Sequence, residues 1–240
     1  DVNAMASRLA ETEGRRVRLL GEVAHEVRTP LTVLDGYVEG LQDGVFEPTP
    51  EVYGELAAEL RRLRRLSDDL GTLSAAEEGV PRLRREPVDV AAVVAVAAER
   101  LRPQLQDAGL GLTVESEGPA VVAADRDRVA QVVTNLVGNA LAATPPGGSV
   151  HVTCRSDGRW AKIDVQDTGV GLAEPDLERI FERFYRVPGA AAPAGGSGIG
   201  LTIARGIARA HDGDLVAASN GPGHGSVFTL RLPLAGGTGS

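Results

Sequence analysis

Hydrophobic residues in the first third of the chain recur at alternating steps of three and four, which is the seven-residue period of packed helices. One series ends near Gln42 and a second follows a turn at Gly44 to Pro50, where Pro48 and Pro50 end one helix and begin the next. The two series comprise Val17, Leu20, Ala24, Val27, Leu31, Leu34, Val38 and Leu41, then Val52, Leu56, Leu60, Leu63, Leu66, Leu70 and Leu73. The pattern predicts an antiparallel helical hairpin. Because one hairpin cannot cover both hydrophobic seams, two should form a homodimeric four-helix bundle.

Beyond about residue 86 the pattern changes to short alternating segments separated by helical ones. Helices are predicted at 90–108, at 126–143 and after Gly198, and strands at 112–115, 120–123, 150–155, 161–166, 215–218 and 227–232. Helices that cover one face of a sheet make a two-layer α/β sandwich. The predicted fold class is therefore α+β, with a helical hairpin followed by this sandwich.

The domain organisation follows from the breaks in these patterns. The helix-breaking run Glu77 to Pro81 predicts a linker at 79–86, between a helical domain at 15–78 and a second domain at 87–234. Residues 235–240 are expected to form a C-terminal tail. Segment 173–195 contains three prolines and many small residues, and it is interpreted as a mobile lid.

Composition changes the picture mainly by exclusion. The 240 residues carry a net charge of −8, which argues against nucleic acid as a partner. The one cysteine, Cys154, has no partner within the chain, so a disulfide framework is excluded and a reducing compartment is expected. The most hydrophobic stretch, 88–98, is too short to span a bilayer. Since the chain begins with Asp1 and not with methionine, we expect a fragment of a longer protein.

His25 is the first candidate for chemistry. In the heptad it takes position b and Thr29 position f, so both should face solvent outside the hydrophobic seam. Pro30 has no N–H for the carbonyl of Glu26, which predicts a bend just beyond His25. Glu26 can accept a hydrogen bond from one ring nitrogen and leave the other unprotonated as a nucleophile. On the heptad alone, an ordinary exposed histidine on a dimeric coiled coil is the alternative.

Two stretches of the second domain carry groups suited to the base and the metal of a magnesium nucleotide. Asn135 and Asn139 lie four residues apart on one helix face, and an amide oxygen is a suitable neutral ligand for Mg²⁺. Asp167 follows a predicted strand, where its carboxylate can accept the exocyclic amine of adenine and would repel the carbonyl of guanine. Gly169 and Gly171 would let the backbone approach the base.

A third stretch is suited to phosphate. Gly196, Gly198 and Gly200 precede a helix that begins near Leu201, and the first N–H groups of a helix attract anions. The run lacks the Lys-Ser/Thr ending of a P-loop and the acidic residue of a dinucleotide-binding fold. Each stretch alone has an ordinary alternative, namely a surface amide pair, a turn after a strand or a flexible loop, so only their combination is specific.

The run His25-Glu26-Val27-Arg28-Thr29-Pro30-Leu31-Thr32 closely resembles the H-box of sensor histidine kinases of two-component systems. The resemblance implies that His25 is the phosphoacceptor, that Glu26 is its acid/base helper, and that Thr29 orients water when the kinase dephosphorylates its partner. Residues 1–14 are similar to the end of a HAMP signalling helix. That similarity implies the cytoplasmic portion of a membrane-anchored protein, with the membrane segment upstream.

The second domain resembles the GHKL ATPases in their histidine-kinase branch, with the N, G1, F and G2 boxes in the expected order. The resemblance implies that Asn139 is the Mg²⁺ ligand, that Asp167 reads adenine, and that Gly196, Gly198 and Gly200 are lid hinges and phosphate contacts. The segment 180–186 would be the F-box, and 223–228 a closing turn that is more structural than catalytic.

One departure from the family pattern concerns the segment after Asn139. The family usually has a basic residue and an aromatic residue there, whereas this chain has Ala142 and Ala143 before Thr144. A phosphate contact and one wall of the adenine pocket would then be absent. Arg183 and Arg186 of the F-box are candidates to compensate.

These features together predict a protein-histidine kinase that uses ATP and Mg²⁺. It would phosphorylate His25 and pass the phosphoryl group to an aspartate of a response regulator receiver domain, with phosphatase activity toward that regulator. The alternatives are a GHKL protein that hydrolyses ATP or phosphorylates serine, and a dimeric scaffold that binds nucleotide without turnover.

Overall fold

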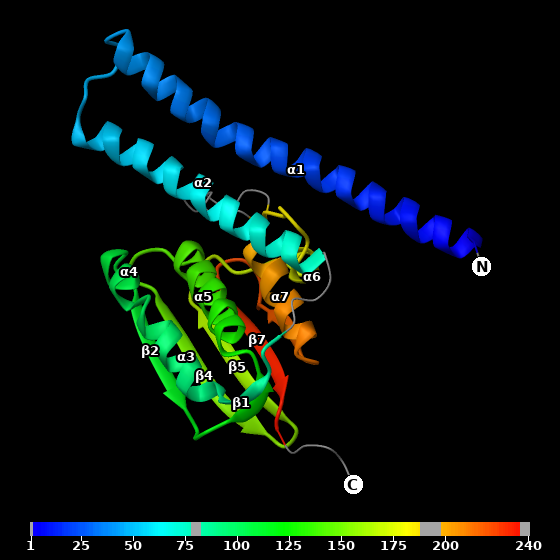
Figure 1. Cartoon of the computed structure of the whole chain (residues 1–240). Coiled ribbons are helices and arrows are strands. Elements are labelled where there is room, and N and C mark those ends of the chain that lie inside the picture. The colour runs from blue at the N-terminus through cyan, green and yellow to red at the C-terminus, as the bar shows by residue number, and fades with distance from the viewer. Residues whose placement is uncertain (1, 78–82, 188–197, 236–240) are drawn as a thin grey trace. The chain divides into compact units, whose positions relative to one another are not determined.

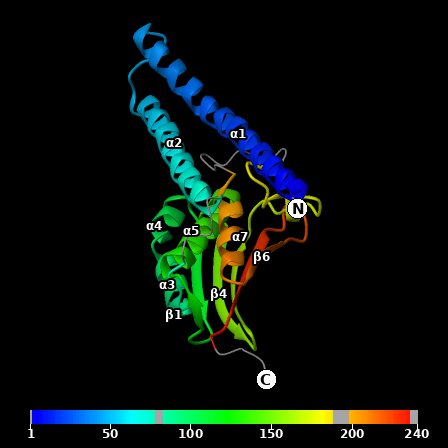
Figure 2. The same ribbon diagram turned by 45° about the vertical axis from the view of Figure 1, so that its right-hand side comes forward.

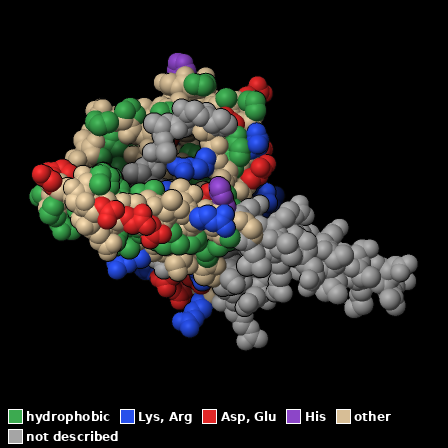
Figure 3. Space-filling view, turned by 90° about the horizontal axis from the view of Figure 1, so that it is seen from above, with side chains coloured by type: hydrophobic (Ala, Val, Ile, Leu, Met, Phe, Trp, Pro, Cys, Tyr) green, Lys and Arg blue, Asp and Glu red, His purple; other side chains and the backbone are tan. Residues whose placement is uncertain are grey.

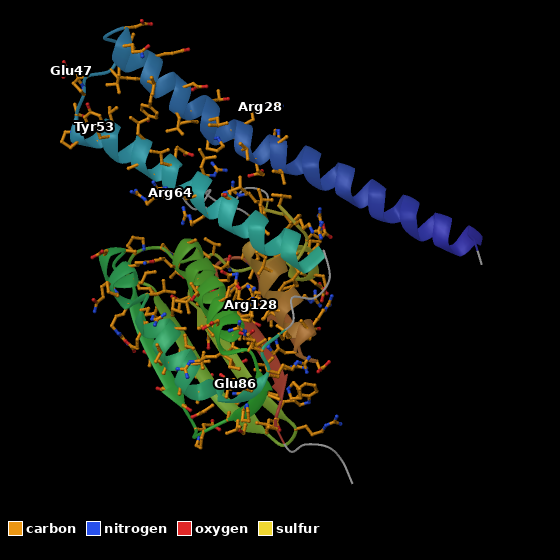
Figure 4. The ribbon with its side chains drawn as sticks, in the orientation of Figure 1. Arg28, Glu47, Tyr53, Arg64, Glu86 and Arg128 are labelled. Atoms are coloured by element: carbon orange, nitrogen blue, oxygen red, sulfur yellow. The ribbon has the colours of Figure 1, made fainter. Side chains whose placement is uncertain are left out.

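The computed structural model describes residues 2–77, 83–187 and 198–235, and it separates into two compact units, 1–68 and 69–240. The first unit is built from α1 (Val2–Gln42) and most of α2 (Pro50–Glu77), which confirms the predicted pair of helices. The two helices run antiparallel (Figure 1), and side chains of both extend into the space between them (Figure 4). Helix α1 continues through Pro30.

The turn of the hairpin is held by backbone and ring contacts. The carbonyl of Gly40 accepts hydrogen bonds from the N–H groups of Val45 and Phe46 at 2.8 and 2.9 Å. The Phe46 ring packs on Tyr37 with 5.4 Å between ring centroids. Helix α2 begins at Pro50, as the sequence predicts, because proline needs no donor in the first turn and its fixed φ suits a helix.

The hairpin of a single chain buries only part of its hydrophobic seam. Val27, Leu34, Leu56 and Leu63 are partly covered, whereas Leu31, Val38 and Leu60 remain 44%, 45% and 50% exposed. Side chains of this size at regular helical spacing are normally covered in the functional state. The exposed seam is therefore available for a second hairpin.

The second unit is a two-layer sandwich, which confirms the predicted fold class. Its five-stranded sheet has the order β2-β4-β5-β7-β6, in which only the β2–β4 pair is parallel. The strands are β2 (Gly111–Ser116), β4 (Ser149–Asp157), β5 (Trp160–Asp167), β6 (Asp214–Ala218) and β7 (Ser226–Pro233). Central β5 pairs with β4 on one side and β7 on the other, so its C-terminal end lies in the middle of the sheet.

Three helices cover one face of this sheet, as Figure 2 shows: α3 (Val90–Glu99), α5 (Arg126–Ala143) and α7 (Gly200–Ala210). Helix α5 lies between the other two and contributes fully buried residues to the core beneath it. That core includes Val133, Leu136, Val137 and Ala140 of α5 and Val152, Ile163, Val165, Phe228 and Leu230 of the sheet. It fixes α5 and the end of β5, which carry the predicted nucleotide groups.

Two local predictions are corrected by the structure, and a third lies partly outside the described residues. The predicted helix at 90–108 is two helices, because α3 ends at Glu99 and α4 (Arg102–Asp107) starts anew with Pro103 in its first turn. Of the predicted linker at 79–86, residues 79–82 lie outside the described residues, and Glu86 already belongs to β1 (Glu86–Asp89), which pairs antiparallel with β3 (Val121–Ala124). The predicted lid at 173–195 contains the short helix α6 (Asp176–Arg179), and its residues 188–195 lie outside the described residues.

Candidate active site

Asp167 lies at the end of β5 and is 2% exposed. Its Oδ1 accepts hydrogen bonds from the N–H groups of Gly169 at 2.8 Å and Ser226 at 3.2 Å. Its Oδ2 is buried without a hydrogen-bond partner among the described residues. Burial raises the pKa of this carboxyl, and the two backbone donors only partly oppose that effect.

A buried acceptor without a donor is costly, so the free Oδ2 needs a physical explanation. An amine donor brought by a ligand would supply the missing hydrogen bond. The exocyclic amine of adenine is such a donor, whereas the carbonyl of guanine at the same place would face another acceptor. The arrangement agrees with the adenine-reading role that the sequence predicts for Asp167.

Gly169 and Gly171 shape the loop after β5 by close backbone contact. A Cβ atom on Gly169 would lie 2.3 Å from the carbonyl oxygen of Ala143, and one on Gly171, whose φ is +68°, would lie 2.2 Å from the carbonyl oxygen of Gly221. Both distances are well inside van der Waals contact, so a side chain would displace the backbone. In this structure the two glycines allow close contact between two backbone segments. The sequence predicts instead that they let the backbone approach the base.

The turn at 223–228 completes the surroundings of Asp167. The N–H of Gly225 donates to the carbonyl of Gly169 at 3.0 Å, and the N–H of Gly223 donates to the carbonyl of Val170 at 2.7 Å. Gly225 also leaves room for the carbonyl of Asp167, which a Cβ atom would approach to 2.0 Å. These contacts agree with the structural role predicted for this turn.

The two asparagines of α5 have different surroundings. Asn135 Nδ2 donates to the carbonyl of Gly200 at 3.0 Å, which ties α5 to the first residue of α7. The side chain of Asn139 is half-buried, and within the described parts of the chain it makes no hydrogen bond. The role of Asn139 as a Mg²⁺ ligand stays a prediction, and Asn135 links α5 to α7.

The start of α7 has the features of an anion site. Its N-cap residue, Ile199, provides no side-chain cap for the first turn, which begins with Gly200 and Leu201. Gly198, with φ of +71°, packs on the backbone of Phe184, and its carbonyl accepts the Phe184 N–H at 2.9 Å. Gly196 lies outside the described residues.

The F-box is anchored to α7 by contacts that the sequence analysis missed. Thr202 Oγ1 donates to the carbonyl of Phe181 at 2.8 Å, and the guanidinium of Arg205 lies 4.5 Å from the centre of the Phe181 ring. Arg205 also pairs with Glu178 at 2.7 Å and with Asp214 at 3.2 Å. These residues are far apart in sequence, so no local motif could have identified them.

The two arginines of the F-box differ in exposure. Arg183 is half-buried and Arg186 is exposed. Ile180 and Phe181 are buried in the domain core, at 7% and 8% exposure. Ile180 and Phe181 thus anchor the F-box in the core, while its arginines lie nearer the surface. On the face seen in Figure 3, basic side chains lie among acidic and hydrophobic ones.

A buried histidine outside every predicted motif joins two helices of this unit. His211 is 1% exposed and follows α7 directly. Its Nε2 accepts a hydrogen bond from the N–H of Asp125 at 3.0 Å, and its Nδ1 lies 2.8 Å from the carbonyl of Ile207. Asp125 is the N-cap of α5 and also accepts the Arg84 N–H at 3.1 Å. The network joins the start of α5 to the end of α7 and to the backbone of Arg84.

In the helical unit, His25 is exposed, as the heptad predicts. Thr29 is exposed one turn later, and its hydroxyl donates to the carbonyl of His25 at 3.4 Å. Glu26 is half-buried and faces α2, where its Oε2 lies 3.6 Å from Arg62 Nη2. Across the described residues, no hydrogen bond joins the His25 ring to Glu26, although the sequence analysis expects one.

Two kinds of feature are absent from the described residues. No helix among them is long and hydrophobic enough to cross a membrane. No group of three or more His, Cys, Asp or Glu side chains among them could hold a metal ion.

Comparison with protein families gives two matches that cover most of the chain. Residues 15–79 match the His Kinase A (phospho-acceptor) domain. Residues 124–236 match the histidine kinase-, DNA gyrase B-, and HSP90-like ATPase family. The first match contains His25, and the second contains Asn139, Asp167 and the glycine run.

Individual relatives agree with these matches. The Escherichia coli signal transduction histidine-protein kinase BaeS is 37% identical over 235 residues, which are 98% of this chain and 50% of BaeS. The solved Acinetobacter baumannii histidine kinase AdeS is 28% identical with a TM-score of 0.72, over 88% of this chain and 98% of AdeS. The solved mycobacterial sensor histidine kinase MprB is 30% identical with a TM-score of 0.55, over 62% of this chain and 97% of MprB.

The chain spans about half the length of BaeS and 37% of the Staphylococcus aureus sensor protein SrrB. Its helical unit with an exposed histidine and its sandwich with a free buried carboxylate oxygen each match one part of the same family. The chain belongs to the sensor histidine kinases of two-component systems.

Proposed function

We propose that this chain uses ATP to phosphorylate His25 and then transfers the phosphoryl group to an aspartate of a response regulator receiver domain. The observation that carries the proposal is the partnerless Oδ2 of Asp167, because a buried acceptor at the end of a central strand suits the amine of adenine. Exposure of His25 on the outside of α1 supports the second half of the proposal.

The nucleotide would be held by three parts of the second unit. Asp167 would accept the adenine amine, and the uncapped first turn of α7 at Gly200 and Leu201 would donate to the phosphates. A Mg²⁺ ion held by the free amide oxygen of Asn139 would neutralise charge on the phosphates. The basic residues Arg183 and Arg186 would add positive charge at the same end of the unit.

The chemical step is an in-line displacement at the γ-phosphorus. One ring nitrogen of His25 forms the new P–N bond while the P–O bond to the leaving group breaks and ADP departs. The proton on the other ring nitrogen passes to the carboxylate of Glu26. The residues of the chain contribute position and charge neutralisation more than covalent chemistry. Phosphotransfer then moves the group from nitrogen to a carboxylate oxygen of the regulator.

The active form would be a homodimer. Leu31, Val38 and Leu60 are between 44% and 50% exposed in the single hairpin, and a second hairpin would cover them. A concentration-dependent mass twice that of the chain, measured by analytical ultracentrifugation, is the expected result. A monomer at all concentrations would contradict this part of the proposal.

The same chain would also dephosphorylate its regulator, with Thr29 orienting the attacking water. The Thr29 hydroxyl is exposed one turn beyond His25, which supports that role. Thr29→Ala should spare His25 phosphorylation and slow the loss of label from the phosphorylated regulator. Equal loss of both activities would assign the hydroxyl to helix structure instead.

Incubation with ATP labelled at the γ-phosphate tests the main proposal. Wild-type protein should acquire acid-labile, base-stable label, and His25→Gln should acquire none while binding ADP normally. The departure at Ala142 and Ala143 favours one second candidate, a scaffold that binds nucleotide without turnover. ADP binding without label would support the scaffold, and free phosphate without labelled protein would support an ATP hydrolase.

A further inference from the structure

The carboxylate of Glu26 faces an arginine of the neighbouring helix. Arg62 of α2 places Nη2 3.6 Å from Glu26 Oε2 and Nη1 3.8 Å from Glu59 Oε2. The three side chains are 19% to 22% exposed, so water reaches them only in part. Arg62 therefore stands between two carboxylates, one from each helix of the hairpin.

The charges in this cluster do not balance. Two carboxylates share one guanidinium, and Glu59 Oε2 is buried without a hydrogen-bond partner among the described residues. Both ion pairs are longer than a hydrogen bond, so neither holds Arg62 tightly. Removing one carboxylate should draw Arg62 closer to the other, because the competition for its charge would end.

Glu26 could pair with the His25 ring or with Arg62, and in this structure it pairs with Arg62. The His25 ring is exposed, whereas the Glu26 side chain is half-buried and turned to α2. To accept the imidazole proton, the carboxylate must leave the side of Arg62 and reach the ring. The strength of the Arg62 pair therefore sets part of the cost of reaching the reactive arrangement.

We infer that Arg62 is a positioning residue that restrains Glu26 on the α2 side and so limits the rate at which His25 is phosphorylated. The inference rests on the proposed function and adds a residue of α2 to it. A movement of α2 along α1 would weaken or strengthen the restraint, which gives the hairpin a direct means to control the chemistry.

The rate of label incorporation at saturating ATP tests this inference. Partly exposed ion pairs contribute about 0.2 to 1 kcal/mol, so Arg62→Gln should raise the rate up to about fivefold, with no change in the ATP concentration that gives half the maximal rate. Simple structural damage would lower the rate instead. Arg62→Lys keeps the positive charge and should return the rate toward that of the wild type.

Glu59→Gln gives the opposite test. Without the competing carboxylate, Arg62 should hold Glu26 more firmly, and the rate should fall. The double variant Glu59→Gln/Arg62→Gln should match Arg62→Gln alone, since Glu59 would act only through Arg62. Arg61→Gln is the matched control, because Arg61 is the exposed neighbour and makes no ion pair within the described parts of the chain. A lower rate for Arg62→Gln, or a rate equal to that of Arg61→Gln, would overturn the inference.

Nitrogen-15 NMR of the His25 ring provides a readout that needs no ATP. Arg62→Gln should shift the ring toward the tautomer whose N–H donates to Glu26, and Glu26→Gln should abolish that shift. If wild-type protein takes no label, the proposed function fails while the NMR comparison still decides the role of Arg62. An unchanged tautomer ratio in Arg62→Gln would overturn the inference by itself.

Discussion

Replacement of Asp167 by asparagine should separate nucleotide binding from folding. The amide keeps an oxygen for the N–H groups of Gly169 and Ser226, but it puts a donor where Oδ2 now offers a free acceptor. A hydrogen bond to a charged group contributes about 1.5 to 3 kcal/mol. The Kd for ADP should therefore rise about 10- to 150-fold.

In Asp167→Asn the affinity for ADP should fall, whereas the free energy of unfolding of the nucleotide-free protein should stay the same or rise. Because burial raises the pKa of Asp167, the folded protein holds this proton more firmly than the unfolded chain does. Stability is therefore lost as pH rises from the unfolded pKa toward the folded one, and at pH 7 the raised pKa of this buried carboxyl is a net cost to folding. Asp167→Asn removes that cost, so its free energy of unfolding at pH 7 should equal or exceed that of the wild type.

Thermal unfolding with and without ADP measures both quantities. At a ligand concentration of 100 times Kd, the wild type gains about 2.7 kcal/mol, and a 100-fold weaker variant should gain only about 0.4 kcal/mol. Asp164→Asn is the matched control, since Asp164 lies on the same strand but pairs with Arg155 and Thr229 instead. Unchanged ADP affinity in Asp167→Asn, or a nucleotide-free protein destabilised by more than about 1 kcal/mol, would refute the reasoning.

Three further predictions concern the frame around the site. Gly171→Ala should cost at least about 2 kcal/mol in urea denaturation, because of its positive φ and the clash with Gly221, whereas Gly206→Ala, in an open helix position, should stabilise by about 0.8 kcal/mol. Cys154 should resist iodoacetamide at pH 7 until the protein unfolds, because burial raises its pKa to about 11. Asp125→Ala should cost about 1 to 2 kcal/mol at pH 7 through loss of the α5 cap. Burial alone would raise the pKa of Asp125, but its backbone donors outweigh burial and lower it, so the cost should shrink as pH falls through that lowered value.

The sequence is a good guide where one strong local signal defines an element. Helix α5 has the predicted limits, 126–143, because Asp125 caps its first turn and a hydrophobic face runs along its length. Elements with weak local signals were missed. Strand β1 has four residues and depends on its pairing with β3, and α6 has only one turn. The break between α3 and α4 had a usable signal in Pro103, which fits the first turn of a helix better than its interior.

The same distinction applies to the site. Asp167, Asn139 and the glycines could be predicted as site residues because each sits in a short run of residues with its own chemistry. Arg62, which reaches Glu26 from the other helix, was not identified from the sequence, because its role depends on a contact across 36 positions in sequence. Arg205 and His211 were missed for the same reason.

The loop after β5 also has a consequence for redesign of nucleotide preference. Gly169 and Gly171 set its course, because a side chain at either position would collide with backbone atoms. Val170 between them is 48% exposed, and its main chain is held by hydrogen bonds. A library that varies position 170 can therefore sample new side chains beside the proposed position of the base without disturbing the backbone around Asp167. Natural sequence drift in this loop should be concentrated at the same position.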